Sequence, residues 1–93
     1  MTIVTYDKNK NELLVKGHAG NDSVCAAVSA LCIALEHRMR ELKPNVDSFG
    51  NNGEYGMRIG SRSYHAEEAV QTVLAGFREL ARMYPNNINI TEV

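Results

Sequence analysis

The chain of 93 residues has few cysteines and prolines, no large excess of charge of either sign and no long hydrophobic run. No apolar stretch approaches the length that spans a bilayer, and Met1–Tyr6 lacks the basic and apolar regions of a signal peptide. Acidic and basic residues are interspersed and give a net charge of −1, so the sequence shows no basic cluster of the kind that binds nucleic acid or an anionic membrane. We therefore expect a cytoplasmic protein that binds neither nucleic acid nor membranes.

The two cysteines, Cys25 and Cys32, fall in one predicted helix. Seven residues of helix correspond to a rise of about 10.5 Å, which is too long for a disulfide bond between them. We expect two free thiols, as is usual in a reducing compartment. With 44% apolar and 23% charged residues, and without repeats, linkers or low-complexity segments, residues 1–93 are expected to form a single domain.

Hydrophobic periodicity predicts a mixed α/β chain. Strands are expected at Thr2–Tyr6, Leu13–His18, Val46–Phe49, Tyr55–Ile59 and around Ile88 and Ile90, with turns at Asp7–Asn11 and Gly50–Gly53. Helices are expected over residues 22–42 and 63–83, with Asp22 and Ser63 as N-caps and with Pro44 and Pro85 ending them. The order ββαββαβ predicts one two-layer domain with a mainly antiparallel sheet and two amphipathic helices, although it leaves the sheet order undetermined.

Apolar residues at three- and four-residue spacing define the expected buried face of each helix. In the first helix this face comprises Val24, Val28, Leu31, Leu35, Met39 and Leu42. In the second it comprises Ala66, Ala69, Val70, Val73, Phe77, Leu80, Ala81 and Tyr84.

The segment from Gly17 to Ser29 contains the residues suited to catalysis. His18 ends a predicted strand, and Cys25 falls in the first turn of the next helix. The positive end of the helix dipole favours a thiolate, and a nearby imidazole can take the thiol proton and return it to a leaving amine. The N–H groups of the same turn can stabilise an oxyanion. The residues alone leave a second interpretation open, in which Cys25 is a small buried hydrophobe and His18 a surface residue.

The other thiol and the other histidines have simpler explanations. Cys32 lies away from the helix N-terminus that activates thiols, so we expect it to pack in the core. His37 and His65 are expected on solvated faces at helix ends. A zinc site made of His18, Cys25 and Cys32 is not expected, because the spacing matches no paired ligand pattern and a fourth ligand is not evident. We expect no metal and no cofactor.

The run GHAGNDSVCAAVSAL resembles the signature of the ribosomal-processing cysteine protease (Prp) family. The shared features are a Gly-His-Ala start, Asp22 three residues before Cys25, and Ala-Ala-Val-Ser after it. The resemblance continues through Gly76-Phe77 and the ARMYP run at residues 81–85 to the end of the chain. One departure is the segment Ala19–Val24, which is shorter than the family's Gly-rich loop; that loop is thought to cover the substrate channel.

The resemblance implies a homodimeric cysteine endopeptidase with Cys25 as nucleophile and His18 as base and then acid. Its substrate would be a protein, either the N-terminal extension of a large-subunit ribosomal protein or, in a phage or prophage relative, a virion protein. Asp22 either orients His18 or is engaged as the N-cap, and Ser29 either lines the site or allows close helix packing. Because the loop is short, an alternative function is a non-catalytic binding or assembly module derived from the protease family.

Overall fold

The elements of the computed structural model follow the predicted order, ββαββαβ, over the residues that the structure describes, 1–42, 46–51, 53–60 and 63–93. They are β1 (Thr2–Asp7), β2 (Glu12–Lys16), α1 (Asp22–Leu42), β3 (Val46–Asn51), β4 (Glu54–Ile59), α2 (Tyr64–Met83) and β5 (Ile88–Glu92).

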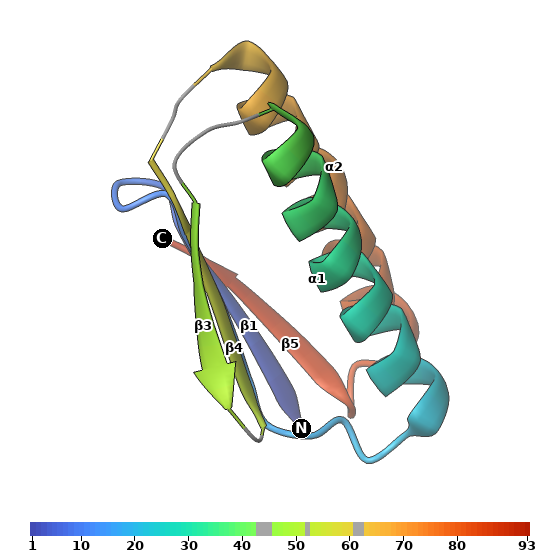
Figure 1. Ribbon diagram of the computed structural model, residues 1–93. Coiled ribbons are helices and arrows are strands. Elements are labelled where there is room, and N and C mark those ends of the chain that lie inside the picture. The colour runs from blue at the N-terminus through green and yellow to red at the C-terminus, as the bar shows by residue number, and fades with distance from the viewer. Residues whose placement is uncertain (43–45, 52, 61–62) are drawn as a thin grey trace.

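The strands form one sheet with the order β3-β4-β2-β1-β5. β1 pairs in parallel with β5, and the other neighbouring pairs are antiparallel, so the sheet is mainly antiparallel as predicted. Figure 1 shows both helices side by side on one face of the sheet, which confirms the two-layer α/β arrangement. The first strand of the chain thus becomes an inner strand, because β5 returns beside it after α2.

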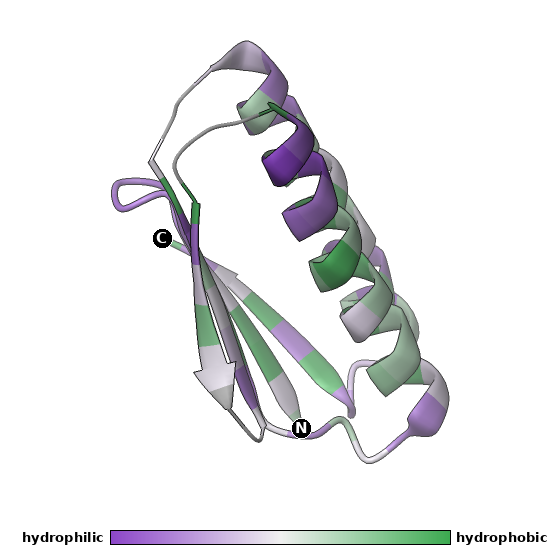
Figure 2. Ribbon diagram, in the orientation of Figure 1, coloured by the Kyte–Doolittle hydropathy of each residue, from purple (hydrophilic) through white to green (hydrophobic). Residues whose placement is uncertain are grey.

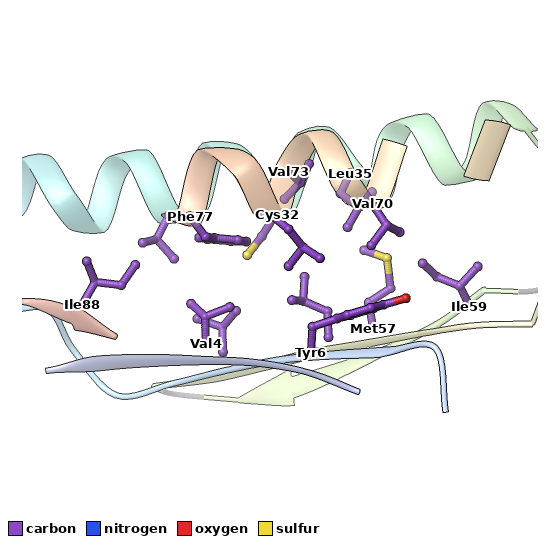
Figure 3. Close-up of a cluster of buried hydrophobic side chains, with 14 of the residues drawn as sticks. Val4, Tyr6, Cys32, Leu35, Met57, Ile59, Val70, Val73, Phe77 and Ile88 are labelled. Atoms are coloured by element: carbon purple, nitrogen blue, oxygen red, sulfur yellow. The ribbon is translucent and has the colours of Figure 1, made fainter. Parts of the chain in front are cut away.

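The core lies between the sheet and the two helices. Along β5 hydrophobic and hydrophilic residues alternate (Figure 2), and along β1 buried residues alternate with more exposed ones, so one side of each strand faces the helices. Val4 and Met57, from β1 and β4, are fully buried beneath Phe77 of α2 and the neighbouring side chains drawn in Figure 3. Complete burial of one such side chain contributes about 1.5–3 kcal/mol of hydrophobic stabilisation.

The buried face of α1 differs from the predicted face at three positions. Cys32, with 5% of its surface exposed, belongs to the core, whereas Leu31 and Leu42 are only partly buried. The cause is the second helix: a β-carbon on Gly76 of α2 would lie 3.0 Å from Leu31 Cδ2. Leu31 therefore packs against the neighbouring helix, and Cys32 faces the sheet, as its interpretation as a packing thiol predicts. In α2, the buried Leu74 was not predicted.

The predicted element ends are correct at some positions and wrong at others. Ser63 is the N-cap of α2, as predicted, because its Oγ accepts a hydrogen bond of 3.2 Å from the Ala66 amide. β3 continues through Asn51, where a turn was predicted from Gly50, because residues 50 and 51 still pair with β4. Pro44, expected to end α1, and Asn52 of the predicted turn lie outside the described residues. Within the described part of the chain, neither helix has the length and apolarity needed to cross a membrane.

Candidate active site

His18 lies in the connection between β2 and α1 rather than in a strand. The predicted strand through His18 is too long, because β2 ends at Lys16 and Gly17 then adopts a φ of +87°. That left-handed conformation turns the chain out of the sheet at a position where glycine carries no steric cost. The Gly17 amide donates a 2.7 Å hydrogen bond to the Gly53 carbonyl, which holds the turn against the start of β4.

The N-cap of α1 is Asn21, not Asp22 as predicted. Asn21 Oδ1 accepts hydrogen bonds from the amides of Ser23 at 2.9 Å and Val24 at 3.1 Å, and its carbonyl accepts from Cys25 at 3.0 Å. Asparagine caps a helix as well as aspartate does, so residue type alone does not favour Asp22 over Asn21. Asp22 becomes the first helical residue with its carboxylate exposed, and Cys25 moves to the fourth position.

This capping changes the expected oxyanion site. The amides of Ser23, Val24 and Cys25 already donate to Asn21, so these N–H groups are not open donors for a substrate oxygen. The first turn still presents the positive end of the helix dipole, which carries roughly half an elementary charge. At Cys25, α1 therefore provides electrostatic stabilisation through its dipole and not through a set of free amide donors.

His18 and Cys25 line the same pocket, between the first half of α1 and the β2–β4 side of the sheet, with a volume of about 310 Å³. Ser29 also lines it, whereas Asp22 does not. The complete lining is Thr2, Val15, Gly17, His18, Cys25, Val28, Ser29, Cys32, Ile33, Gly53, Glu54 and Tyr55. The structure thus brings three of the four predicted site residues to one cavity.

Gly53 provides the space for the imidazole, a role that the sequence did not reveal. A β-carbon built on Gly53 would lie 3.2 Å from His18 Nε2, so the ring packs directly over the glycine backbone. The sequence showed Gly53 only as a turn residue. No local pattern could indicate this contact, since the two residues are 35 positions apart and meet only through the β2–β4 pairing.

Tyr55 joins the sheet to α1 at the wall of the pocket. Its hydroxyl donates a 2.9 Å hydrogen bond to Glu36 Oε1, and Glu36 also forms an ion pair with Arg40. Burial, followed by the hydrogen bond to Glu36 and then the negative charge of Glu36, raises the pKa of Tyr55, so the hydroxyl stays protonated and remains a donor. The hydrogen bond from Tyr55 is the largest cause that lowers the pKa of the Glu36 carboxyl.

Substituting Tyr55 with phenylalanine is expected to raise the pKa of Glu36 toward its ordinary value of 4.5. A carboxyl with a lowered pKa in the folded state contributes stability that is present above its unfolded pKa and lost as the pH falls through the folded one. The variant should therefore lose less of its remaining stability on acidification below about pH 5. An NMR titration of the Glu36 side-chain carboxyl carbon measures the change. Tyr6→Phe is the matched control, because the Tyr6 hydroxyl donates to Asn11 Oδ1 instead.

The two thiols are expected to react at different rates. Cys25 is partly exposed, whereas Cys32 is buried, and burial and the nearby Glu36 charge raise the Cys32 pKa to about 11. Because the thiolate is the reactive form, iodoacetamide should label Cys25 in the folded protein and leave Cys32 unmodified. Peptide mapping by mass spectrometry over a time course measures both rates. In urea the two rates should converge, and equal rates in the folded protein would contradict Cys25 as the nucleophile.

The remaining histidines lie outside this pocket. His37 and His65 are both exposed, as predicted. The His65 ring packs edge-on against the Tyr64 ring, with 5.7 Å between the ring centroids. Among the described residues no three His, Cys, Asp or Glu side chains cluster as metal ligands would.

A cysteine and a histidine that line one pocket, with the cysteine near a helix N-terminus, are an arrangement typical of thiol-dependent hydrolases. The chain belongs to the cysteine protease Prp family, whose sequence model matches residues 1–89. The search of curated proteins found no match.

Several solved structures have similar folds, among them the following three. The ribosomal processing protease Prp from Staphylococcus aureus with a covalently linked product peptide has a TM-score of 0.90 at 22% identity, with 100% of both chains covered. The same protein with a substrate peptide has a TM-score of 0.78 at 20% identity, covering 99% of this chain and 97% of that one. SMU.848 from Streptococcus mutans has a TM-score of 0.74 at 21% identity, covering 99% and 91%. At this identity the likeness concerns the fold.

Proposed function

We propose that this protein is a cysteine endopeptidase in which Cys25 is the nucleophile and His18 the general base and acid. The observation that supports this most directly is that both side chains line one pocket at the N-terminus of α1. Membership of a cysteine protease family supports it independently. The Staphylococcus aureus relative has been captured with a covalently linked product peptide, which is the kind of adduct that a nucleophilic side chain forms.

In this mechanism His18 takes the proton of the Cys25 thiol, and the sulfur attacks the carbonyl carbon of the scissile peptide bond. The bond to the nitrogen breaks as the imidazolium returns the proton to the leaving amine, which leaves a thioester on Cys25. His18 then takes a proton from water, and the hydroxide attacks the thioester carbonyl so that the carbon–sulfur bond breaks and the peptide is released with a free carboxyl group. The imidazolium returns its proton to the sulfur, which restores the Cys25 thiol. The helix dipole stabilises the negative charge on sulfur at the start and at the end of the cycle.

Ser29 and Asp22 are proposed to support the dyad in different ways. Ser29 lies one helical turn after Cys25 and lines the pocket, where its hydroxyl can bond to the bound peptide. Asp22 is free of the capping role and lies in the first turn, so its carboxylate is proposed to orient His18 electrostatically.

The proposed substrate is the N-terminal extension of a large-subunit ribosomal protein, or a virion protein if the chain comes from a phage. The Staphylococcus aureus relative is a ribosomal processing protease, which supports the first choice. Apolar lining by Val15, Val28 and Ile33 favours a substrate with an apolar side chain in the pocket. We propose that the protein acts as a homodimer in the cytoplasm, where ribosomes are assembled.

The test is incubation of the purified protein with synthetic peptides that span the junction of each candidate extension, followed by mass spectrometry. Cleavage at one peptide bond, lost in Cys25→Ala and in His18→Ala, is the expected result. Binding of a peptide without cleavage under the same conditions would contradict the protease and support a binding module instead.

A further inference from the structure

The backbone on each side of His18 is held by a hydrogen bond from a different element. Before it, the Gly17 amide donates to the Gly53 carbonyl at 2.7 Å. After it, the Ala19 carbonyl accepts a 2.8 Å hydrogen bond from the side-chain Nδ2 of Asn87. His18 itself is exposed, so these two bonds, and not burial of the ring, limit how far its backbone can move.

Asn87 is well placed to act as a fixed anchor. It lies between α2 and β5. There its backbone N–H donates to the Tyr84 carbonyl at 3.0 Å, and its backbone carbonyl accepts from the Thr2 amide at 2.9 Å. Both backbone groups of Asn87 are therefore engaged, and the side chain extends from a backbone that is tied to β1 and to the end of α2. Ala19 is 3% exposed, so its small side chain is also enclosed at this point.

We infer that Asn87 is a positioning residue, which holds the Ala19 carbonyl and thereby keeps the His18 imidazole facing Cys25. This inference rests on the proposed dyad. The segment from Ala19 to Val24 is closed at its other end by the Asn21 cap, so it is fastened at both ends. In this chain the short segment Ala19–Val24 is held in a fixed conformation that sets the His18–Cys25 geometry, and it does not act as a lid over the substrate.

The first experiment compares Asn87→Asp and Asn87→Ala with Asn86→Asp, a control that places the same charge on the exposed neighbouring residue. An ionised carboxylate cannot donate to the Ala19 carbonyl, although it has nearly the size of the amide. We expect kcat for peptide cleavage to fall about 10-fold or more in both Asn87 variants, with KM changed less than about 2-fold, because misplacement of the base affects the chemical step. Unchanged kcat in both variants would overturn the inference.

A double-mutant cycle on Cys25 alkylation separates positioning from a general structural role. Iodoacetamide rates at Cys25 are measured for wild type, His18→Ala, Asn87→Ala and the double variant, below the melting temperature of each. If Asn87 acts through His18, each single variant slows alkylation and the double variant reacts no more slowly than His18→Ala. Additive effects would show that Asn87 does not act through His18 and would overturn the inference.

The same cycle distinguishes failure of this inference from failure of the proposed function. If His18→Ala leaves the Cys25 alkylation rate and its pH profile unchanged, the dyad is wrong and the inference fails with it. If His18→Ala slows alkylation while both Asn87 variants match Asn86→Asp, the dyad stands and the positioning role alone is refuted. Should Asn87→Ala unfold, Asn87→Asp in the same cycle provides the measurement.

Discussion

Cys25→Ser is expected to abolish peptide cleavage while leaving the protein folded. Cysteine and serine are nearly isosteric, and Cys25 is only partly buried in the first turns of α1, where a serine hydroxyl finds solvent or backbone partners. The hydroxyl is far harder to deprotonate than the thiol, so His18 cannot generate the nucleophile efficiently. We expect kcat/KM to fall by about 10³-fold or more with a change in unfolding free energy below about 1 kcal/mol.

The control for this substitution is Cys32→Ala, which removes the other thiol. Turnover should persist in that variant, whereas the melting temperature should fall, because Cys32 is 5% exposed and belongs to the core. Cleavage assayed by mass spectrometry and thermal unfolding followed by circular dichroism measure the two effects. An unfolded Cys25→Ser protein, or loss of turnover in Cys32→Ala alone, would contradict the assignment of the nucleophile.

Gly17→Ala is expected to cost more stability than any other single methyl group added in the connection between β2 and α1. Gly17 has a φ of +87°, and a β-carbon there would lie 2.5 Å from the Met1 carbonyl oxygen, a backbone atom that cannot rotate away. The dihedral angle alone costs alanine about 1–2 kcal/mol, and the clash forces either β1 or the connection to shift. Since Gly17 precedes His18, cleavage should decrease together with stability.

Gly20→Ala is the matched comparison, because Gly20 also has a positive φ, of +73°, but nothing lies within 4 Å of the added carbon. Gly20→Ala should therefore lose only the unfolding free energy that the unfavourable dihedral angle costs. In a domain of this size, each kcal/mol lost lowers the melting temperature by roughly 4–8 °C. Thermal melts of the two variants therefore isolate the contribution of the clash. Equal melting temperatures would show that the contact with Met1 is relieved without cost.

Local sequence patterns were enough to predict most of the secondary structure. Helical periodicity identified both helices, and the side chain of Ser63 fixed the start of α2, because caps depend on groups only a few residues apart. The same patterns placed Cys25 near a helix N-terminus and His18 just before it. Asn21 and Asp22 have equal capping ability, so residue type does not decide between them; the prediction of Asp22 was wrong, and Asn21 is the N-cap in the structure.

Only the tertiary structure decided what surrounds these residues. The sheet order brings β4 beside β2, which places Gly53 under the His18 ring and Tyr55 at the pocket wall. Packing of Leu31 against Gly76 turns Cys32 toward the sheet, and Asn87 reaches Ala19 across 68 positions of sequence. Such contacts depend on the relative placement of whole elements, which is set by the burial of the shared core and is not encoded in the spacing of neighbouring residues.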